Sequence, residues 1–153
     1  MESSLEVVQK LSECFGRDIY HNGRLNRGLL SSRVFGKSDK IVLLNSIVHP
    51  VVRFDFYRWS ESLNEEICFV ESAILYESRF DELVDEVWTV TAPEELRISR
   101  VRQRSGLTEE EIKKRMAAQL SEEEKQRRAA HIIWNDGNVS VIHRVLSLLK
   151  SLE

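Results

Sequence analysis

The sequence predicts an α/β fold in which a helical region precedes a mostly parallel sheet. The first 63 residues carry apolar side chains at helical spacing, whereas short apolar runs rich in β-branched residues alternate with helical patterns after Asn64. Strands that alternate with helices form βαβ units, and the strands of such units are parallel. The length of 153 residues fits one domain.

Four helices are expected in the first 63 residues. Ser3-Ser4-Leu5-Glu6 fits a capping box that opens a helix ending at Gly16. The apolar positions of this helix are Leu5, Val8, Leu11 and Phe15. A turn at His21-Asn22-Gly23 leads to a second helix that starts at Asn26 and carries Leu29, Leu30, Arg33 and Val34.

Pro50 is expected to separate the third helix from the fourth. The third carries Ile41, Leu44, Ile47 and Val48, and the fourth carries Val51, Phe54, Trp59 and Leu63. Because a proline disfavours helical angles at the residue before it, His49 is predicted to lie at a helix junction.

Three runs are predicted to be parallel strands buried on both faces: 67–70, 87–91 and 131–134. Helical patterns lie between and after them, over 94–104, from Thr108, from Ser121, and over a last helix that carries Ile142, Val145, Leu146, Leu149 and Leu152. Ligands of such sheets bind beyond the carboxyl ends of the strands. We therefore expect 71–77, 91–94 and 135–138 to face one cleft, with the arginine-rich helices between the last two strands as a mobile lid.

Hydropathy and cysteine spacing argue against several classes of protein. Neither a membrane span nor a signal peptide is visible, so a cytoplasmic protein is expected. Cys14 and Cys68 have no ligand spacing, so we interpret them as buried small apolar side chains and expect no metal site.

Charge is unevenly distributed along this chain of net charge −3. Residues 97–128 hold ten Lys and Arg against six Glu, a local charge of +4. Guanidinium groups bind phosphate bidentately, so this excess indicates a small polyanion such as a nucleoside polyphosphate, the alternative being a solvated helix face. The overall charge and the interspersed glutamates disfavour nucleic acid.

Gly36-Lys37-Ser38 matches only the end of the phosphate loop GxxxxGK[ST]. Ser31 occupies the position of the first glycine, and the preceding residues are predicted to be helical, whereas the motif must join a strand to a helix. We interpret this segment as a plain turn.

Five motifs in order resemble the dephospho-coenzyme A kinase family. The most specific is Leu44 to Arg53, which resembles the family's LNxIxHPxxR. Glu71 to Glu77 is the second motif, with Ala73 where the family has Pro, and Val90 to Glu95 with the arginines that follow is the third. The fourth is Arg115 to Gln119, which resembles RxxxQ, and the fifth is Ala130 to Gly137. The family transfers the γ-phosphate of ATP to the 3′-hydroxyl of dephospho-CoA.

The resemblance implies a fold of the P-loop NTPase and nucleoside monophosphate kinase type. It divides one domain, 1–153, into a helical CoA-side region over 1–64, an α/β core over 65–95 and 129–153, and a lid over 96–128. The family's first strand, phosphate loop and catalytic Asp have no match here. We therefore expect a truncated kinase that is inactive as this chain, although ATP and Mg²⁺ are expected for the full-length family.

The resemblance also implies site residues, each with a structural alternative. Arg104 and Arg115 would carry transition-state charge unless they form surface ion pairs. Nucleotide binding is implied for Arg100, Gln119, Asn135 and Gly137, although Gln119 could cap a helix and an Asn-Asp-Gly turn needs no function. His49, Arg53 and Glu77 resemble acceptor-binding residues, although His49 could be structural and Glu77 a solvated carboxylate. No metal ligand is implied.

Two competing interpretations remain open at this point. One is a non-catalytic interaction module whose exposed strand edges are filled by a partner or by another copy. The other is nucleic-acid binding, which the charge disfavours. The expected partners are thus dephospho-CoA and ATP, with no nucleic acid, no membrane and a possible homo-oligomer.

Overall fold

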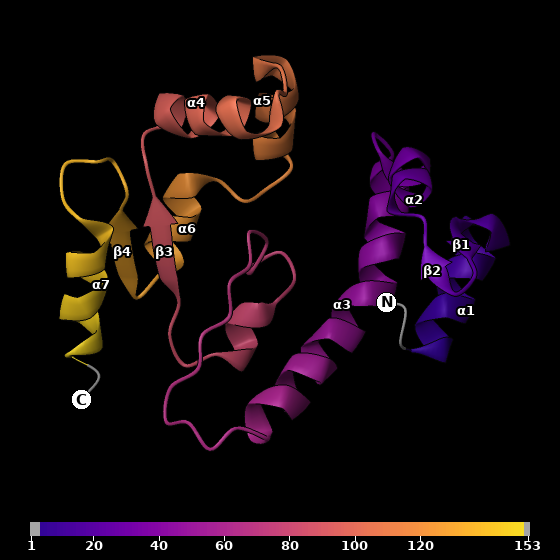
Figure 1. Ribbon diagram of the computed structural model, residues 1–153, viewed down its shortest axis with the longest axis horizontal. Coiled ribbons are helices and arrows are strands. Elements are labelled where there is room, and N and C mark those ends of the chain that lie inside the picture. The colour runs from indigo at the N-terminus through magenta and orange to yellow at the C-terminus, as the bar shows by residue number, and fades with distance from the viewer. Residues whose placement is uncertain (1–3, 152–153) are drawn as a thin grey trace. The chain divides into compact units, whose positions relative to one another are not determined.

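The computed structural model describes residues 4–151, which form two compact units, 1–70 and 71–153 (Figure 1). Each unit is described by itself below. None of the helices in the described part of the chain is both long and apolar enough to cross a membrane. The prediction of one domain with three regions stays a prediction.

Helices dominate the first unit. It consists of α1 (Leu5–Phe15), the 3-10 turn η1 (Arg17–Ile19), a hairpin of β1 (Tyr20–His21) and β2 (Arg24–Leu25), α2 (Arg27–Val34) and α3 (Ser38–Glu61). The predicted turn at 21–23 is confirmed, because Asn22 and Gly23 both have positive φ and close the two-residue hairpin. The predicted second helix is confirmed, and Asn26 caps it by accepting from the Leu29 N–H at 3.0 Å.

The core of this unit lies between α1, η1 and α2. Its buried residues are Val7, Leu11, Phe15, Ile19, Leu30 and Val34. The expected inward face of α1 was therefore partly wrong, since Val7 is buried and Leu5 is 88% exposed. Ser4 is the N-cap, and Ser3 lies outside the described residues. Arg33 fixes the far end of α1 by donating to the Phe15 carbonyl and to Asp18.

The predicted break at Pro50 was wrong, because α3 is one helix of 24 residues with Pro50 inside it. A proline inside a helix removes one backbone hydrogen bond and costs about 3 kcal/mol. Ile47 and Val48 before Pro50 and Val51 after it pack partly buried against the same core, which favours continuation of the helix. His49 therefore lies in a helix interior and not at a junction.

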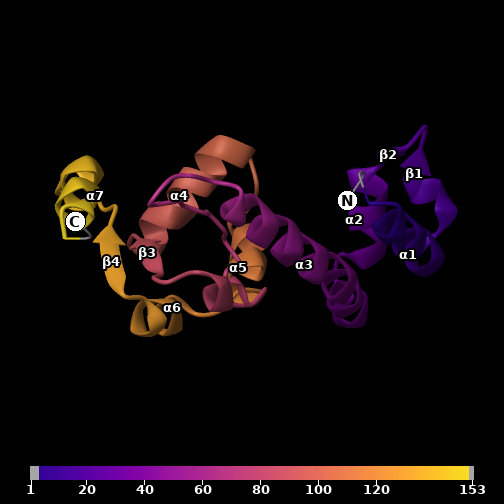
Figure 2. The same ribbon diagram turned by 90° about the horizontal axis from the view of Figure 1, so that it is seen from below.

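The second unit contains the parallel sheet (Figure 2). Its elements are the 3-10 turn η2 (Phe80–Leu83), β3 (Trp88–Thr91), α4 (Glu94–Ser105), α5 (Glu109–Ala117), α6 (Glu122–Arg128), β4 (His131–Trp134) and α7 (Val141–Leu149). Strands β3 and β4 are parallel, with Trp88 opposite His131 and Thr91 opposite Trp134. The capping box at Thr108 and the helix start at Ser121 are confirmed. Leu152, predicted for the last helix, lies outside the described residues.

The predicted strand over 67–70 was wrong. These residues have no regular secondary structure, and the side chains of Ile67 and Phe69 are 45% and 62% exposed. A strand is held by hydrogen bonds to a neighbouring strand, and no strand in residues 4–151 pairs with this run. Apolar composition alone was therefore insufficient to form it.

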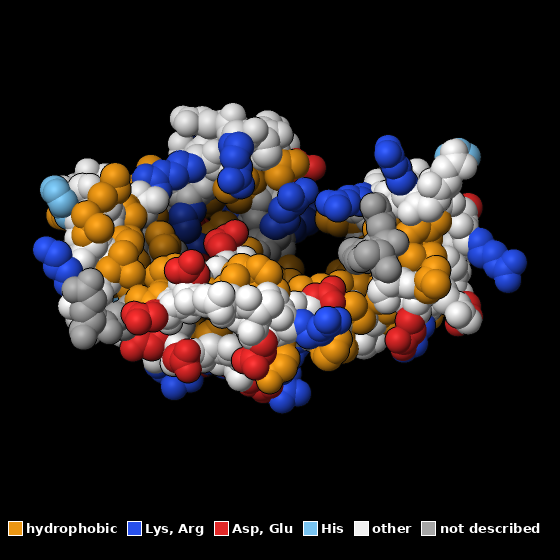
Figure 3. All heavy atoms as spheres, turned by 60° about the horizontal axis from the view of Figure 1, so that its bottom comes forward, with side chains coloured by type: hydrophobic (Ala, Val, Ile, Leu, Met, Phe, Trp, Pro, Cys, Tyr) orange, Lys and Arg blue, Asp and Glu red, His pale blue; other side chains and the backbone are white. Residues whose placement is uncertain are grey.

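The prediction that the sheet is buried on both faces was also wrong. Ile133 is buried, but Val90, Ile132 and Trp134 are 57%, 42% and 39% exposed. The sheet has only two strands, α6 packs against β3, and α7 packs against β4, so neither face is covered completely. Hydrophobic side chains also reach the surface where α7 lies, at the left of Figure 3, and Ile142 and Leu146 are exposed there.

Both cysteines are free and exposed, which corrects the expectation that they are buried. Cys14 lies on α1 away from the inward-facing Leu11 and Phe15, and Cys68 lies in the irregular run 67–70. The turn expected at Gly36-Lys37-Ser38 is confirmed, because it joins α2 to α3 with Gly36 at φ 73°.

Candidate active site

The carboxyl ends of β3 and β4 bring together two of the three segments that were expected to share a cleft. The Asn135 N–H donates to the Thr91 carbonyl at 2.7 Å, which extends the strand pairing by one bond. Arg100 on α4 reaches the same place, since its Nη1 donates to the Asn135 carbonyl at 2.8 Å. Two predicted nucleotide-binding residues, Arg100 and Asn135, are therefore in direct contact.

Gly137 stands in the turn that follows β4. Its φ of 90° is costly for residues that carry a side chain, so glycine is the residue that suits this turn. Asp136 accepts from the Asn138 N–H at 3.0 Å and so closes an Asx turn. This backbone hydrogen bond is the main reason that the pKa of Asp136 is lowered. The turn is thus ordered by its own local contacts beside Asn135.

Helices α4 and α5 carry two arginines that form no ion pair with other described residues. Arg100 and Arg104 are four residues apart on α4 and share one face, and α4 packs against α5, which carries Arg115. Arg104 and Arg115 are exposed, and neither forms an ion pair with any described residue. Arg115 nevertheless interacts electrostatically with Glu111, because its charge is one of the causes that lower the pKa of that carboxyl group.

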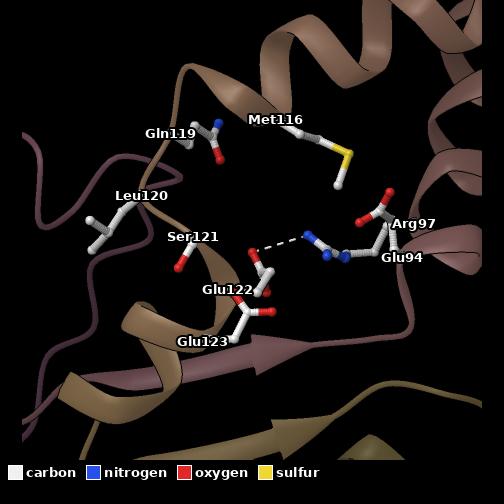
Figure 4. Close-up of a pocket in the computed structure, with 8 residues that line it drawn as sticks. All are labelled: Glu94, Arg97, Met116, Gln119, Leu120, Ser121, Glu122 and Glu123. Atoms are coloured by element: carbon white, nitrogen blue, oxygen red, sulfur yellow. Dashed lines mark ion pairs between the residues drawn. The ribbon is translucent and has the colours of Figure 1, made fainter.

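A pocket of about 190 Å³ lies between the starts of α4 and α6 and the end of α5 (Figure 4). It is lined by Glu94, Arg97, Met116, Gln119, Leu120, Ser121, Glu122 and Glu123. Arg97 pairs with Glu122 at 3.0 Å, and Lys125 lies 3.6 Å from the same carboxylate. The Thr91 hydroxyl donates to Glu122 at 3.0 Å, so a buried strand residue supports this pair.

Gln119 is the one predicted site residue that lines this pocket. Its Oε1 accepts from Lys125 Nζ at 3.1 Å, across the start of α6. The other lining carboxylates, Glu94 and Glu123, make the pocket acidic. The cations that suit a polyphosphate are therefore those on the exposed face of α4 and on α5, outside the pocket.

Glu77 lies within the turn that precedes η2 and contacts the connection between α5 and α6. Its Oε1 accepts from the Leu120 N–H at 2.6 Å. Glu77 therefore contacts the connection between α5 and α6, whereas the sequence predicted that 71–77 share a cleft with 91–94 and 135–138.

His49 and Arg53 lie four residues apart on α3, in the first unit, so they share a helix face. Burial lowers the pKa of His49, and the neighbouring charge of Arg53 lowers it further. A neutral imidazole beside a guanidinium is therefore favoured, and this pair can donate and accept hydrogen bonds with an anionic or hydroxyl-bearing ligand.

Sequence reasoning did not assign a role to Glu122 or Lys125. The spacing of three residues between them was a usable signal, because side chains at i and i+3 meet on a helix. Their partners Arg97 and Gln119 lie on α4 and in the connection between α5 and α6, and no local pattern predicts such pairs.

The described residues offer no ligand set for a metal ion. No group of three or more His, Cys, Asp or Glu side chains in residues 4–151 is placed to hold one. We therefore assign no magnesium ligand and derive no step through a metal.

Comparison with known proteins decides the family. A family model described as dephospho-CoA kinase matches residues 1–140. The chain belongs to the dephospho-CoA kinase family. Curated dephospho-CoA kinases from Bacteroides fragilis and Corynebacterium diphtheriae are 37% and 36% identical to it, each over 95% of this chain. The chain covers 72% and 74% of these two relatives.

Solved structures confirm the fold class expected for a dephospho-CoA kinase. A crystal structure from Thermus thermophilus aligns with a TM-score of 0.79 at 32% identity, over 94% of this chain and 74% of that one. Dephospho-CoA kinase from Campylobacter jejuni aligns with a TM-score of 0.65 at 25% identity, over 99% of this chain and 80% of that one. The resemblance seen in the sequence motifs is thus confirmed along nearly the whole chain.

Proposed function

We propose that this chain is a dephospho-CoA kinase-like protein of coenzyme A biosynthesis, which binds ATP and dephospho-CoA but does not by itself complete the phosphorylation of the 3′-hydroxyl. The observation that carries the proposal is the match to dephospho-CoA kinases over 95% of the chain. The arrangement of cations around the end of β4 is consistent with it, because phosphoryl transfer depends on positive charge placed over the polyphosphate.

Four residues form the nucleotide side of the proposed site: Arg100, Gln119, Asn135 and Gly137. Support comes from the contact between Arg100 and Asn135 at the end of the sheet, where α/β folds bind ligands. The exposed Arg104 and Arg115 are proposed to stabilise charge in the transition state. Their lack of ion-pair partners among the described residues leaves both guanidinium groups available to phosphate oxygens.

His49 and Arg53 on α3 are proposed to bind the acceptor, and the same role is proposed for Glu77 in the second unit. The His49–Arg53 pair on α3 supports this assignment, because burial keeps the imidazole neutral beside a guanidinium. Mg²⁺ is proposed to arrive bound to ATP, since the described residues offer no ligand set of their own. A cytoplasmic location stays a prediction.

Binding and turnover are tested separately with the purified 153-residue protein. Calorimetry should detect the binding of dephospho-CoA and the binding of ATP. His49→Ala should weaken only the binding of dephospho-CoA, whereas Arg100→Ala should weaken only the binding of ATP. Absence of heat with both ligands at millimolar concentration would refute the proposal. An ADP-release assay with both substrates tests the prediction that this chain does not complete transfer, which rests on the missing GxxxxGK[ST] motif. Robust turnover would refute that prediction.

Self-association is the second candidate function, and the exposed Val90, Ile132 and Trp134 on the two-stranded sheet favour it. Exposed apolar groups on a small sheet can be covered by another copy. Sedimentation at several protein concentrations tests this proposal. A monomer at all concentrations would remove it without affecting the kinase proposal.

A further inference from the structure

Helix α6 has no hydrophobic residue. Its sequence is Glu-Glu-Glu-Lys-Gln-Arg-Arg, and none of its residues is buried. A helix of seven residues is not stable by itself in water, and most helices in proteins are held by an apolar face. The attachment of α6 must therefore come from polar contacts with its neighbours.

Strand β3 supplies one set of these contacts. The Thr91 hydroxyl donates to Glu122 at 3.0 Å and accepts from Gln126 at 3.3 Å. The Thr89 hydroxyl donates to the Lys125 carbonyl at 3.5 Å, at the limit of a hydrogen bond. These bonds hold the first turn and the middle of α6 against the sheet, but they do not reach its last residue or the connection that precedes the helix.

The segment that runs from Tyr76 to Asp81 holds both ends of α6. At the start, Glu77 accepts from the Leu120 N–H at 2.6 Å, one residue before the N-cap Ser121. At the end, Arg128 pairs with Asp81 at 2.6 Å, and its guanidinium carbon lies 4.1 Å from the centre of the Tyr76 ring. Tyr76 is itself buried, so this second anchor rests on a fixed ring.

The start of α6 also contacts Gln119, one of the residues proposed for the nucleotide side. Glu122 in its first turn pairs with Arg97, and Lys125 donates to Gln119. Figure 4 shows Gln119, Leu120 and Glu122 along the connection from α5 into α6, with Arg97 opposite. Any shift of Leu120 moves Gln119 next to it and changes the reach of Glu122 to Arg97.

We propose that Glu77 is a positioning residue for the nucleotide side: its carboxylate fixes the α5–α6 connection at Leu120 and thereby places Gln119. The part that concerns nucleotide rests on the proposed function, and the placement of the connection does not. In this role Glu77 acts through Leu120 and the start of α6. Its effect is therefore expected on the nucleotide side of the site as well as on the acceptor side to which the sequence resemblance assigned it.

Amide hydrogen exchange on the whole protein tests the placement without any ligand. Glu77→Ala removes the acceptor, so exchange at Leu120 and in the first turn of α6 should rise by about tenfold. Glu77→Gln keeps an acceptor oxygen of similar reach and should restore most of the protection. Asp81→Asn is the matched control, because it loosens the same segment at Arg128 and should raise exchange near residues 127–129 only.

Two outcomes would overturn the placement: unchanged exchange at Leu120 in Glu77→Ala, or an equal rise across the whole unit, which would indicate general destabilisation. Nucleotide affinity is measured on the same variants with ATP. Glu77→Ala should weaken the affinity for ATP about threefold to tenfold, whereas Glu77→Gln and Asp81→Asn should bind ATP with nearly the affinity of the parent protein. Equal ATP affinity in all three variants would overturn the nucleotide part. If the parent does not bind ATP, the proposed function fails, whereas the exchange data still decide the placement.

Discussion

Arg100 and Asn135, which are 35 residues apart in sequence, are joined by a hydrogen bond of 2.8 Å from the guanidinium to the backbone carbonyl. The bond ties α4 to the carboxyl end of β4. Because the acceptor is a main-chain carbonyl, its position depends on the sheet and not on the identity of residue 135. The predictions below begin with this contact.

Arg100→Ala should remove the link between α4 and the turn after β4. We expect a loss of about 1 kcal/mol in the free energy of unfolding, because one charge-assisted bond at the surface is lost. ATP affinity should fall by about tenfold by calorimetry. Arg102→Ala, an exposed arginine on the same helix, is the control and should change neither quantity appreciably. Equal effects of the two substitutions would contradict the assignment.

Arg104→Ala and Arg115→Ala should separate binding from stability. Neither side chain forms an ion pair with a described residue. The free energy of unfolding, measured by thermal unfolding, should therefore change by no more than about 0.5 kcal/mol, as is usual for surface substitutions. ATP binding should weaken in both variants, since a guanidinium that faces phosphate is lost. A clear drop in melting temperature with unchanged ATP affinity would assign both residues to structure alone.

Leu11→Ala should destabilise the first unit. Leu11 is fully buried, and removing its side chain leaves a cavity, which costs about 2 to 5 kcal/mol. Leu5→Ala is a matched control, because it makes the same change on the same helix at a position 88% exposed. Urea unfolding followed by circular dichroism measures both. The core assignment is wrong if the two variants unfold at the same midpoint.

His49 should give the protein a pH-dependent stability. Burial and the charge of Arg53 lower its folded pKa below the ordinary histidine value of 6.5. The unfolded chain then binds a proton more readily, so stability falls as pH drops from above 6.5 through the folded pKa. Urea unfolding between pH 8 and pH 5 should show this loss, and His49→Gln should reduce it. His143→Gln, at an exposed position on α7, serves as control; a slope unchanged in His49→Gln would contradict the prediction.

Most helices and two strands could be predicted from the sequence because their determinants are local. Thr108 and Ser121 carry capping signals within three residues, and β4 was expected over the four residues that form it. The continuous α3 could not be predicted. Pro50 is a local signal against a helix, and the packing of the residues on both sides of it depends on helices elsewhere in the unit.

The prediction of a strand over 67–70 was wrong for a related reason. Its side chains have strand character, but a strand is a property of a pair, and no local signal tells whether a neighbour is present. In the candidate site, the resemblance supplied Arg100 and Asn135, and only the structure could show their contact. Glu77 was found from its motif, whereas its bond to Leu120 depends on a contact between residues 43 positions apart.

The absence of apolar residues in α6 also makes its attachment sensitive to ionic strength. Mobile ions screen exposed charge pairs, with a Debye length of about 10 Å at 0.1 M salt and about 3 Å at 1 M. The ion pairs of Arg128 with Asp81 and of Arg97 with Glu122 are only partly exposed, so concentrated salt should weaken them less than it weakens fully exposed pairs, whereas sulfate strengthens the burial of the apolar core around Leu11. Buffer composition alone should thus loosen α6 while the first unit remains folded.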